Sequence, residues 1–159
     1  MKDKEKIILY VGGTFDLFHY GHIRFLKRCK SISDHVVVAL NSDDFVAAFK
    51  TEAPLLNYEE RRECLEGCRY VDQVIKHTSG LDSKPTILSV KPSIIAVGSD
   101  WKHKDYFSQM SFDDAWLRQN KIELVYLDYT TEISSTKIKE RLITRRQHTD
   151  ADHSRFIKE

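Results

Sequence analysis

The sequence predicts a single α/β domain in which a doubly wound, mostly parallel sheet of five strands is covered by helices on both faces. Two observations carry this prediction. Short apolar runs such as His35–Leu40 and Ile94–Val97 alternate with segments of helical periodicity. These runs are continuous and rich in β-branched residues, which is typical of parallel strands buried on both faces. At 159 residues the chain is long enough for one domain with a substantial core.

The predicted elements alternate along the chain. The expected strands are Ile7–Tyr10, His35–Leu40, Val71–Ile75, Ile94–Val97 and Ile122–Leu127. The expected helices cover residues 23–29, 45–47, 58–65, 84–90, 112–119 and 134–142, with Asn57 and Ser83 as candidate N-caps. Residues 49–57 lack periodicity and predict a loop or lid. We expect the domain to span residues 1–144 and a polar, mobile tail to span residues 145–159.

Composition excludes several classes of function. Lysine and arginine number 25 against 24 aspartate and glutamate residues, so the basic excess of a nucleic-acid binder is missing. No apolar run reaches the length of a membrane span, and the charged start lacks the apolar core of a signal peptide. Three cysteines without a framework spacing fit a reducing compartment. We therefore expect a cytoplasmic protein that binds neither nucleic acid nor membranes.

The strongest chemical signal follows the first expected strand directly. The pair Gly12-Gly13 ends that strand, and a helical pattern begins shortly after it. Such a turn brings backbone N–H groups and the positive end of a helix dipole to one point, which favours phosphate binding. His19 and His22 lie three residues apart at the helix start, on one face, where imidazoles can donate to phosphate oxygens. No P-loop and no dinucleotide fingerprint is present, so kinase and NAD-binding interpretations lose support.

The pattern Gly13-Thr14-Phe15-Asp16-x-x-His19-x-Gly21-His22 resembles the HxGH signature of the nucleotidyltransferase superfamily, whose domains are Rossmann-like, and within it the cytidylyltransferase branch. Three further segments are similar to the glycerol-3-phosphate cytidylyltransferase family. Residues 69–75 resemble its RYVDxVI segment, residues 98–101 its GDDW and residues 133–139 its ISTTKIK. The resemblance runs from Ile7 to about Leu142. The ends of the first and fourth strands and the start of the last helix should then share one rim of the sheet.

The resemblance implies transfer of CMP from CTP to a small phosphorylated acceptor, such as glycerol-3-phosphate or another polar phosphate. Pyrophosphate is released, and the product is a CDP-activated precursor for a surface polymer or capsule. It implies a homodimer and Mg²⁺ bound as the triphosphate complex, with no resident metal site. The implied catalytic residues are His19, His22 and Lys50. The implied nucleotide-binding residues are Gly13, Thr14, Phe15, Gly21, Arg69, Asp100, Ser134, Ser135 and Thr136. The implied acceptor-binding residues are Asp16, Arg61, Trp101 and Tyr129.

Several of these roles have a structural alternative. Asp16 can stabilise its turn, Lys50 can be a solvated loop lysine, and Ser134 alone can cap the last helix. Arg61 can lie on a helix surface, and Arg69 can form a salt bridge at the sheet edge. Tyr129 stands where the family carries an arginine, and residues 102–116 form a longer, aromatic-rich segment. These departures leave open an adenylyltransferase of the sugar-phosphate or FMN type, and, ranked lower, a nucleotide sensor without turnover.

Overall fold

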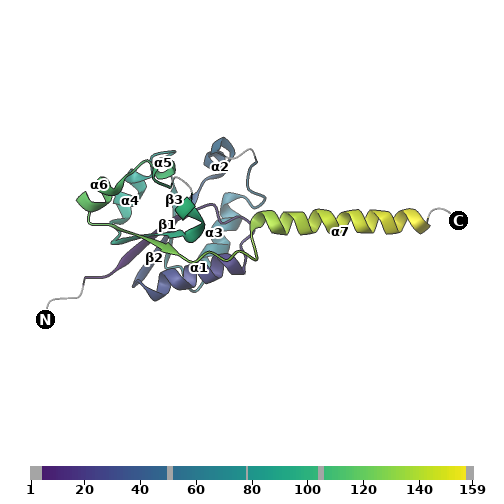
Figure 1. The fold of residues 1–159 in the computed structure, drawn as a ribbon, viewed down its shortest axis with the longest axis horizontal. Coiled ribbons are helices and arrows are strands. Elements are labelled where there is room, and N and C mark those ends of the chain that lie inside the picture. Colours follow the sequence, from purple (N-terminus) through teal and green to yellow (C-terminus); the bar gives the residue numbers. More distant parts are fainter. Residues whose placement is uncertain (1–4, 50–51, 78, 104–105, 157–159) are drawn as a thin grey trace.

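In the computed structural model, which describes residues 5–49, 52–77, 79–103 and 106–156, five strands form one all-parallel sheet (Figure 1). The strands are β1 (Ile8–Gly13), β2 (His35–Asn41), β3 (Gln73–His77), β4 (Ile94–Gly98) and β5 (Glu123–Leu127). Their order is β3-β2-β1-β4-β5, so the chain winds outward in both directions from β1. The prediction of a single, doubly wound α/β domain is confirmed.

Helices connect the strands. They are α1 (Tyr20–Ser31), α2 (Asp43–Phe49), α3 (Tyr58–Glu66), α4 (Lys84–Val90), α5 (Tyr106–Met110), α6 (Asp114–Gln119) and α7 (Ser135–Phe156), with a 3₁₀ helix, η1, at Ser99–His103. Asn57 caps α3 as predicted, because its side chain accepts from the backbone N–H of Glu60. Ser83 occupies the N-cap position of α4, but its hydroxyl donates to the carbonyl of Met110 instead of capping the helix.

Most element boundaries differ from the prediction by a few residues, and three of the differences have a clear cause. Strand β3 begins at Gln73, because the Asp72 carboxylate accepts from Val36 N–H and Lys30 and so holds the chain in a turn before the strand. The predicted helix 112–119 is preceded by a separate helix, α5, and begins later, after the N-cap Asp113. Helix α7 continues to Phe156 instead of ending at Leu142, since no glycine or proline follows to stop it.

Two apolar clusters cover the two faces of the sheet. Leu9 and Val11 of β1 face one cluster together with Leu26 of α1, whereas Tyr10 faces the other together with Ile87 of α4. This alternation follows from the pleat of a strand, which points successive side chains to opposite faces. Helices α1 and α3 therefore pack on one face and α4, α5 and α6 on the other (Figure 1).

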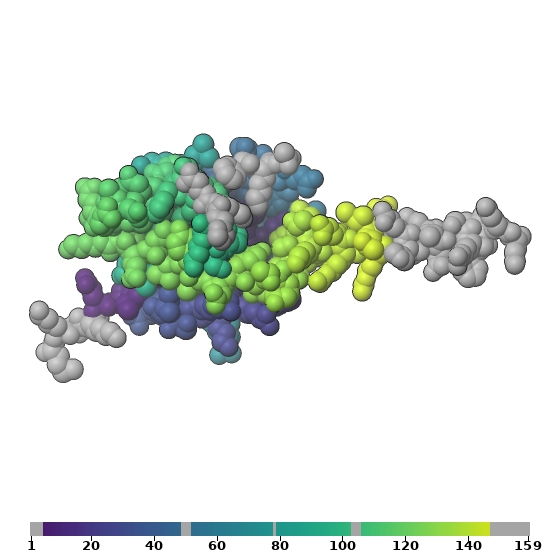
Figure 2. Space-filling model, viewed as in Figure 1, coloured from purple at the N-terminus to yellow at the C-terminus, as the bar shows by residue number. Residues whose placement is uncertain are grey.

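Helix α7 lies apart from these layers. Figure 1 shows it projecting away from the body, and in Figure 2 its first turns rest against the body. Leu142 and Ile143 on this helix are more than half exposed, at 58% and 59%. The predicted boundary between residues 144 and 145 thus falls inside a continuous helix. None of the helices in the described ranges is both long and apolar enough to span a membrane.

Candidate active site

A cavity of about 930 Å³ opens at the carboxyl end of the sheet, where the strand order reverses between β1 and β4. The three segments predicted to share this rim meet there. The site residues among its lining are Gly13, Thr14, Phe15, Asp16, His19, Gly21, His22, Asp100, Trp101, Tyr129, Ser134, Ser135 and Thr136. Of the other predicted site residues, Arg61 and Arg69 do not line the cavity, and Lys50 lies outside the described residues.

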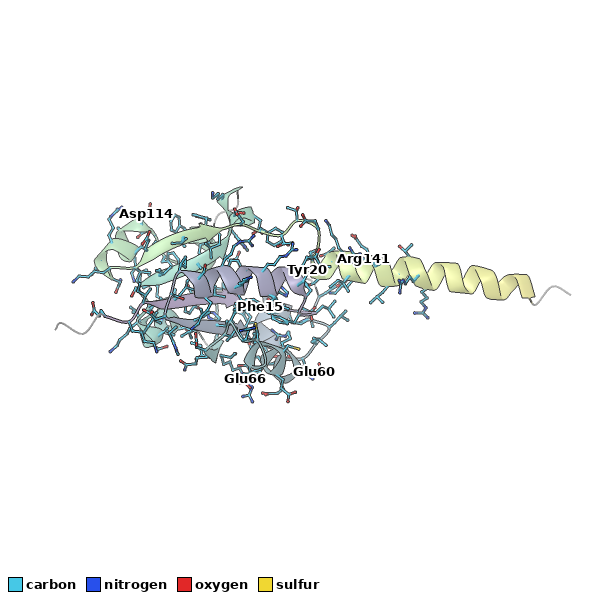
Figure 3. The ribbon with its side chains drawn as sticks, turned by 90° about the horizontal axis from the view of Figure 1, so that it is seen from below. Phe15, Tyr20, Glu60, Glu66, Asp114 and Arg141 are labelled. Atoms are coloured by element: carbon cyan, nitrogen blue, oxygen red, sulfur yellow. The ribbon has the colours of Figure 1, made fainter. Side chains whose placement is uncertain are left out.

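The turn after β1 is shaped by an aromatic side chain. Phe15 has a positive φ of 51° and is only 8% exposed, and Figure 3 shows it inside the body. A Cβ added to Gly13 would lie 2.9 Å from the Phe15 ring, so glycine is required at this position. The ring also packs 5.1 Å from the imidazole of His22, between centroids. Phe15 therefore supports the turn after β1 from within the core.

His19 and His22 are stacked at the start of α1. Their ring centroids are 3.8 Å apart with an interplanar angle of 17°, and His19 occupies the N-cap position. Burial, helped by the neighbouring His19, lowers the pKa of His22 to about 3, although Asp16 acts in the opposite direction. Burial also lowers the pKa of His19. Both imidazoles are therefore neutral at pH 7, and a neutral imidazole can donate one hydrogen bond.

The backbone fixes the tautomer of His22. Its Nδ1 accepts from the N–H of His19 at 3.4 Å, so the single proton of the neutral ring resides on Nε2. The Nδ1 of His19 is buried and has no hydrogen-bond partner among the described atoms. Gly21 makes room for this ring, because a Cβ there would lie 3.0 Å from the His19 imidazole and 2.8 Å from Ile133.

Asp16 ties the motif to the loop before α3. Its carboxylate accepts from the backbone N–H groups of Leu17, Leu55 and Leu56, each at 3.0 Å, and its side chain is nearly buried. These contacts favour the turn-stabilising alternative over direct contact with an acceptor. The carbonyl of Asp16 accepts from the Ser135 hydroxyl at 2.7 Å, which attaches the start of α7 to the same turn.

Arg61 belongs to the frame of the site, which corrects its predicted contact with the acceptor. The side chain is fully buried, and its guanidinium donates to the carbonyls of Thr14, Asn41 and Leu56 and to the Asp43 carboxylate. A planar fork of donors suits this task, because it can bridge three carbonyls on three separate segments. Arg61 thus joins the turn after β1, the end of β2 and the loop before α3.

Arg69 also lies away from the cavity, which argues against its predicted role in nucleotide binding. It is exposed and precedes β3, at the amino end of the strands, whereas the cavity lies at their carboxyl end. Its guanidinium carbon lies over the Tyr70 ring, 5.7 Å from the centroid. Within this protomer Arg69 is therefore not a nucleotide-binding residue.

Helix α7 brings a second helix N-terminus to the cavity. Ser134 accepts from the N–H of Lys137 and so caps the helix, while Ser135 and Thr136 line the cavity. One turn further on, Lys139 lies 3.9 Å from Asp16 Oδ2 and 4.0 Å from Glu52 Oε2. Among the described lining residues Lys139 is the single lysine or arginine. The sequence signal that could have identified it is its i+4 spacing from Ser135.

The ends of β4 and β5 form the next wall. A Cβ on Gly98 would lie 2.5 Å from Asp100 Oδ1, so the glycine allows Asp100 to fold back over the strand end. Tyr129 is 42% exposed on the cavity wall, and its N–H donates to the Ser99 hydroxyl.

Asn41 at the end of β2 was not among the predicted site residues, but it lines the cavity and donates from Nδ2 to the Thr14 hydroxyl at 3.3 Å. In the described ranges no group of three His, Cys, Asp or Glu residues is arranged to hold a metal ion.

Comparison with known proteins agrees with this geometry. The model of the cytidylyltransferase-like family matches residues 10–141. The chain therefore belongs to the cytidylyltransferase-like family, and it is an enzyme of the nucleotidyltransferase class. It is 38% identical to the glycerol-3-phosphate cytidylyltransferase of Bacillus subtilis, over 87% of this chain and 97% of that protein. It is 34% identical to an FAD synthase of Pyrococcus horikoshii, over 89% of this chain and 96% of that protein.

A solved structure shares the fold. The lipopolysaccharide core biosynthesis protein from Thermoplasma volcanium is 29% identical, with a TM-score of 0.61 over 79% of this chain and 97% of that chain. The family model ends at residue 141, so most of α7 extends past the matched region.

Proposed function

We propose that this protein is a cytidylyltransferase that transfers CMP from CTP to a small phosphorylated acceptor and releases pyrophosphate. One observation carries the proposal: the neutral, stacked pair His19 and His22 lies at one helix N-terminus, and Ser135 and Thr136 lie at another, around one cavity. Two helix N-termini and two imidazoles supply hydrogen-bond donors to a triphosphate. This is an arrangement for stabilising negative charge on phosphoryl oxygens.

The chemistry needs alignment more than proton transfer. An acceptor phosphate oxygen attacks the α-phosphorus of CTP, the bond between α-phosphorus and the bridging oxygen breaks, and pyrophosphate leaves with that electron pair. The attacking oxygen is already anionic at pH 7, so no general base is required. His22 donates from Nε2 to oxygens that gain charge in the transition state, and Lys139 adds a fixed positive charge.

Mg²⁺ fits this reaction as the partner of the triphosphate, whose charge it neutralises. Asp16 is an unsuitable ligand because its oxygens already accept from three backbone N–H groups. Asp100 and Glu52 are the other carboxylates on the cavity wall that would face such a complex.

Glycerol-3-phosphate is one candidate acceptor, because the relative from Bacillus subtilis carries that name. Its CDP derivative would be an activated precursor for a surface polymer or capsule. We further propose that the enzyme works in the cytoplasm as a homodimer. These statements follow the resemblance and are independent of the cavity geometry.

A second candidate is an adenylyltransferase of the sugar-phosphate or FMN type. The similarity to FAD synthases and the presence of Tyr129, where the glycerol-3-phosphate family carries an arginine, favour it. A nucleotide sensor without turnover is the weaker alternative, because the histidine pair and both helix N-termini are intact.

Pyrophosphate release tests all three candidates. CTP, ATP, GTP and UTP are each supplied with a pool of phosphorylated acceptors that includes glycerol-3-phosphate, sugar phosphates, phosphocholine and FMN. The expected signal is confined to CTP, is lost in His19→Ala and is retained in His35→Ala, whose histidine lies at the opposite end of β2 from the cavity. Release with ATP alone would establish the second candidate. Tight nucleotide binding without release would indicate the sensor.

A further inference from the structure

The cavity has two ends that differ in chemistry. One end holds the histidine pair and the start of α7, where phosphates are expected. The other end lies over the opposite face of the sheet, on the side of α4 and α5. Its apolar lining, which we call the tyrosine lobe, consists of Tyr10, Phe45, Leu81, Trp101, Tyr106 and Met110.

The tyrosine lobe offers few polar groups to a charged or polyhydroxylated ligand. No lysine or arginine is among its described residues. Two of the polar side chains that line the cavity here are already engaged, because His77 donates from Nε2 to the carbonyl of Gly80 and Ser83 donates to the carbonyl of Met110. Gln109 of α5 also lines the cavity. A small polyol placed here would replace only some of its hydrogen bonds to water. A flat or apolar body fits the aromatic walls.

One polar atom in the tyrosine lobe is without a partner. The hydroxyl of Tyr10 is buried and forms no hydrogen bond with the described atoms. A buried hydroxyl is normally paired, so an unpaired one at a cavity wall indicates a position for a ligand group. Burial also raises the pKa of Tyr10, so the hydroxyl stays protonated and can donate.

Gly12 opens the space beside that hydroxyl. The residue is exposed in the cavity, and a Cβ added to it would lie 3.5 Å from the Tyr10 hydroxyl and 3.7 Å from the terminal methyl of Met110. Those distances are ordinary contacts, so an alanine fits without a clash and would fill the gap. Met110 is the movable neighbour, because a methionine side chain adapts its shape readily.

We propose that the tyrosine lobe binds the body of the phosphorylated acceptor, that this body is flat and largely apolar, and that one of its polar groups hydrogen-bonds to the Tyr10 hydroxyl. The inference rests on the proposed function and narrows the acceptor from the candidates named there. Tyr10 and Gly12 are then specificity-determining residues. The nucleotide keeps to the phosphate end and the rim formed by β4 and β5.

Direct binding tests the inference without requiring turnover. FMN, which has a flat heteroaromatic body and a phosphate, is compared with glycerol-3-phosphate by calorimetry on the full-length protein. We expect FMN to bind at least tenfold more tightly. Tyr10→Phe should weaken FMN binding about fivefold, the effect of one neutral hydrogen bond, and Gly12→Ala should weaken it further by filling the lobe. CTP or ATP binding should stay unchanged in both variants.

Gly67→Ala is the matched control, because it adds the same methyl group at a helix end away from the cavity, with ordinary contacts only. Equal or tighter binding of glycerol-3-phosphate would overturn the inference. So would binding of neither phosphate, or FMN binding that is indifferent to Tyr10→Phe and Gly12→Ala. Failure of the proposed function has a separate signature, because pyrophosphate would then be released with no pair of substrates, whatever the binding result.

Discussion

Replacement of Arg61 tests how the turn after β1 is held in place. In Arg61→Met the apolar stem is retained and the guanidinium is lost, so the carbonyls of Thr14, Asn41 and Leu56 lose their donor. A buried polar group without a partner costs about 1–3 kcal/mol. The ion pair with Asp43 adds little, because that carboxylate is 41% exposed. Since water entering the space relieves part of the loss, we expect a destabilisation of about 4 kcal/mol.

Urea unfolding followed by far-ultraviolet circular dichroism measures this change. Arg62→Met is the matched control, because the next residue of α3 is 43% exposed and pairs with Glu59 and Glu66 at the surface. It should change the free energy of unfolding by less than about 1 kcal/mol. Figure 3 shows Glu66 pointing away from the body. If both variants lose stability equally, the bridging role of Arg61 is refuted.

Three further predictions concern the cavity. The pKa of His22 is about 3 in the folded protein and 6.5 in the unfolded chain, so the unfolded chain takes up a proton first as pH falls. The free energy of unfolding, measured by urea titration, should therefore drop by about 2 kcal/mol between pH 7 and pH 5. The drop should be smaller in His22→Gln. Gly21→Ala displaces the imidazole of His19 and should lower kcat at least about a hundredfold in the pyrophosphate assay. Lys139→Ala removes a positive charge from the phosphate end of the cavity and should lower kcat/KM about a hundredfold. Lys27→Ala, on the exposed face of α1, is the control and should leave kcat/KM unchanged.

Each of these has a result that contradicts it. An identical pH dependence in His22→Gln would mean that other groups cause the loss of stability. Full activity in Gly21→Ala would show that the turn tolerates a shifted imidazole. For Lys139, partial rescue by arginine but not by glutamine is expected, because the charge and not the packing is proposed to matter; equal activity in all three variants would remove it from the site.

Much of the fold could be predicted from the sequence, because the signals involved are local. The apolar run His35–Leu40 predicted a strand buried on both faces, and Asn57 predicted a capped helix start, each within a few residues of chain. The motif from Gly13 to His22 located the phosphate end of the cavity for the same reason. Helix α5 was missed because it is a single short turn whose aromatic residues, among them Tyr106, pack against distant parts of the core.

The sequence by itself determined the class of fold, the rim at which the site lies and the histidine pair, because hydrophobic periodicity and a strand-turn-helix motif act over short stretches. The tertiary structure decided which side chains frame the cavity and which face it. Arg61 reaches Thr14 across 47 residues of sequence, and Ser135 reaches Asp16 across 119. The unpaired hydroxyl of Tyr10 is likewise visible only once β1 is packed against Met110. Such roles depend on which donors and acceptors meet after folding, and sequence spacing does not encode those distances.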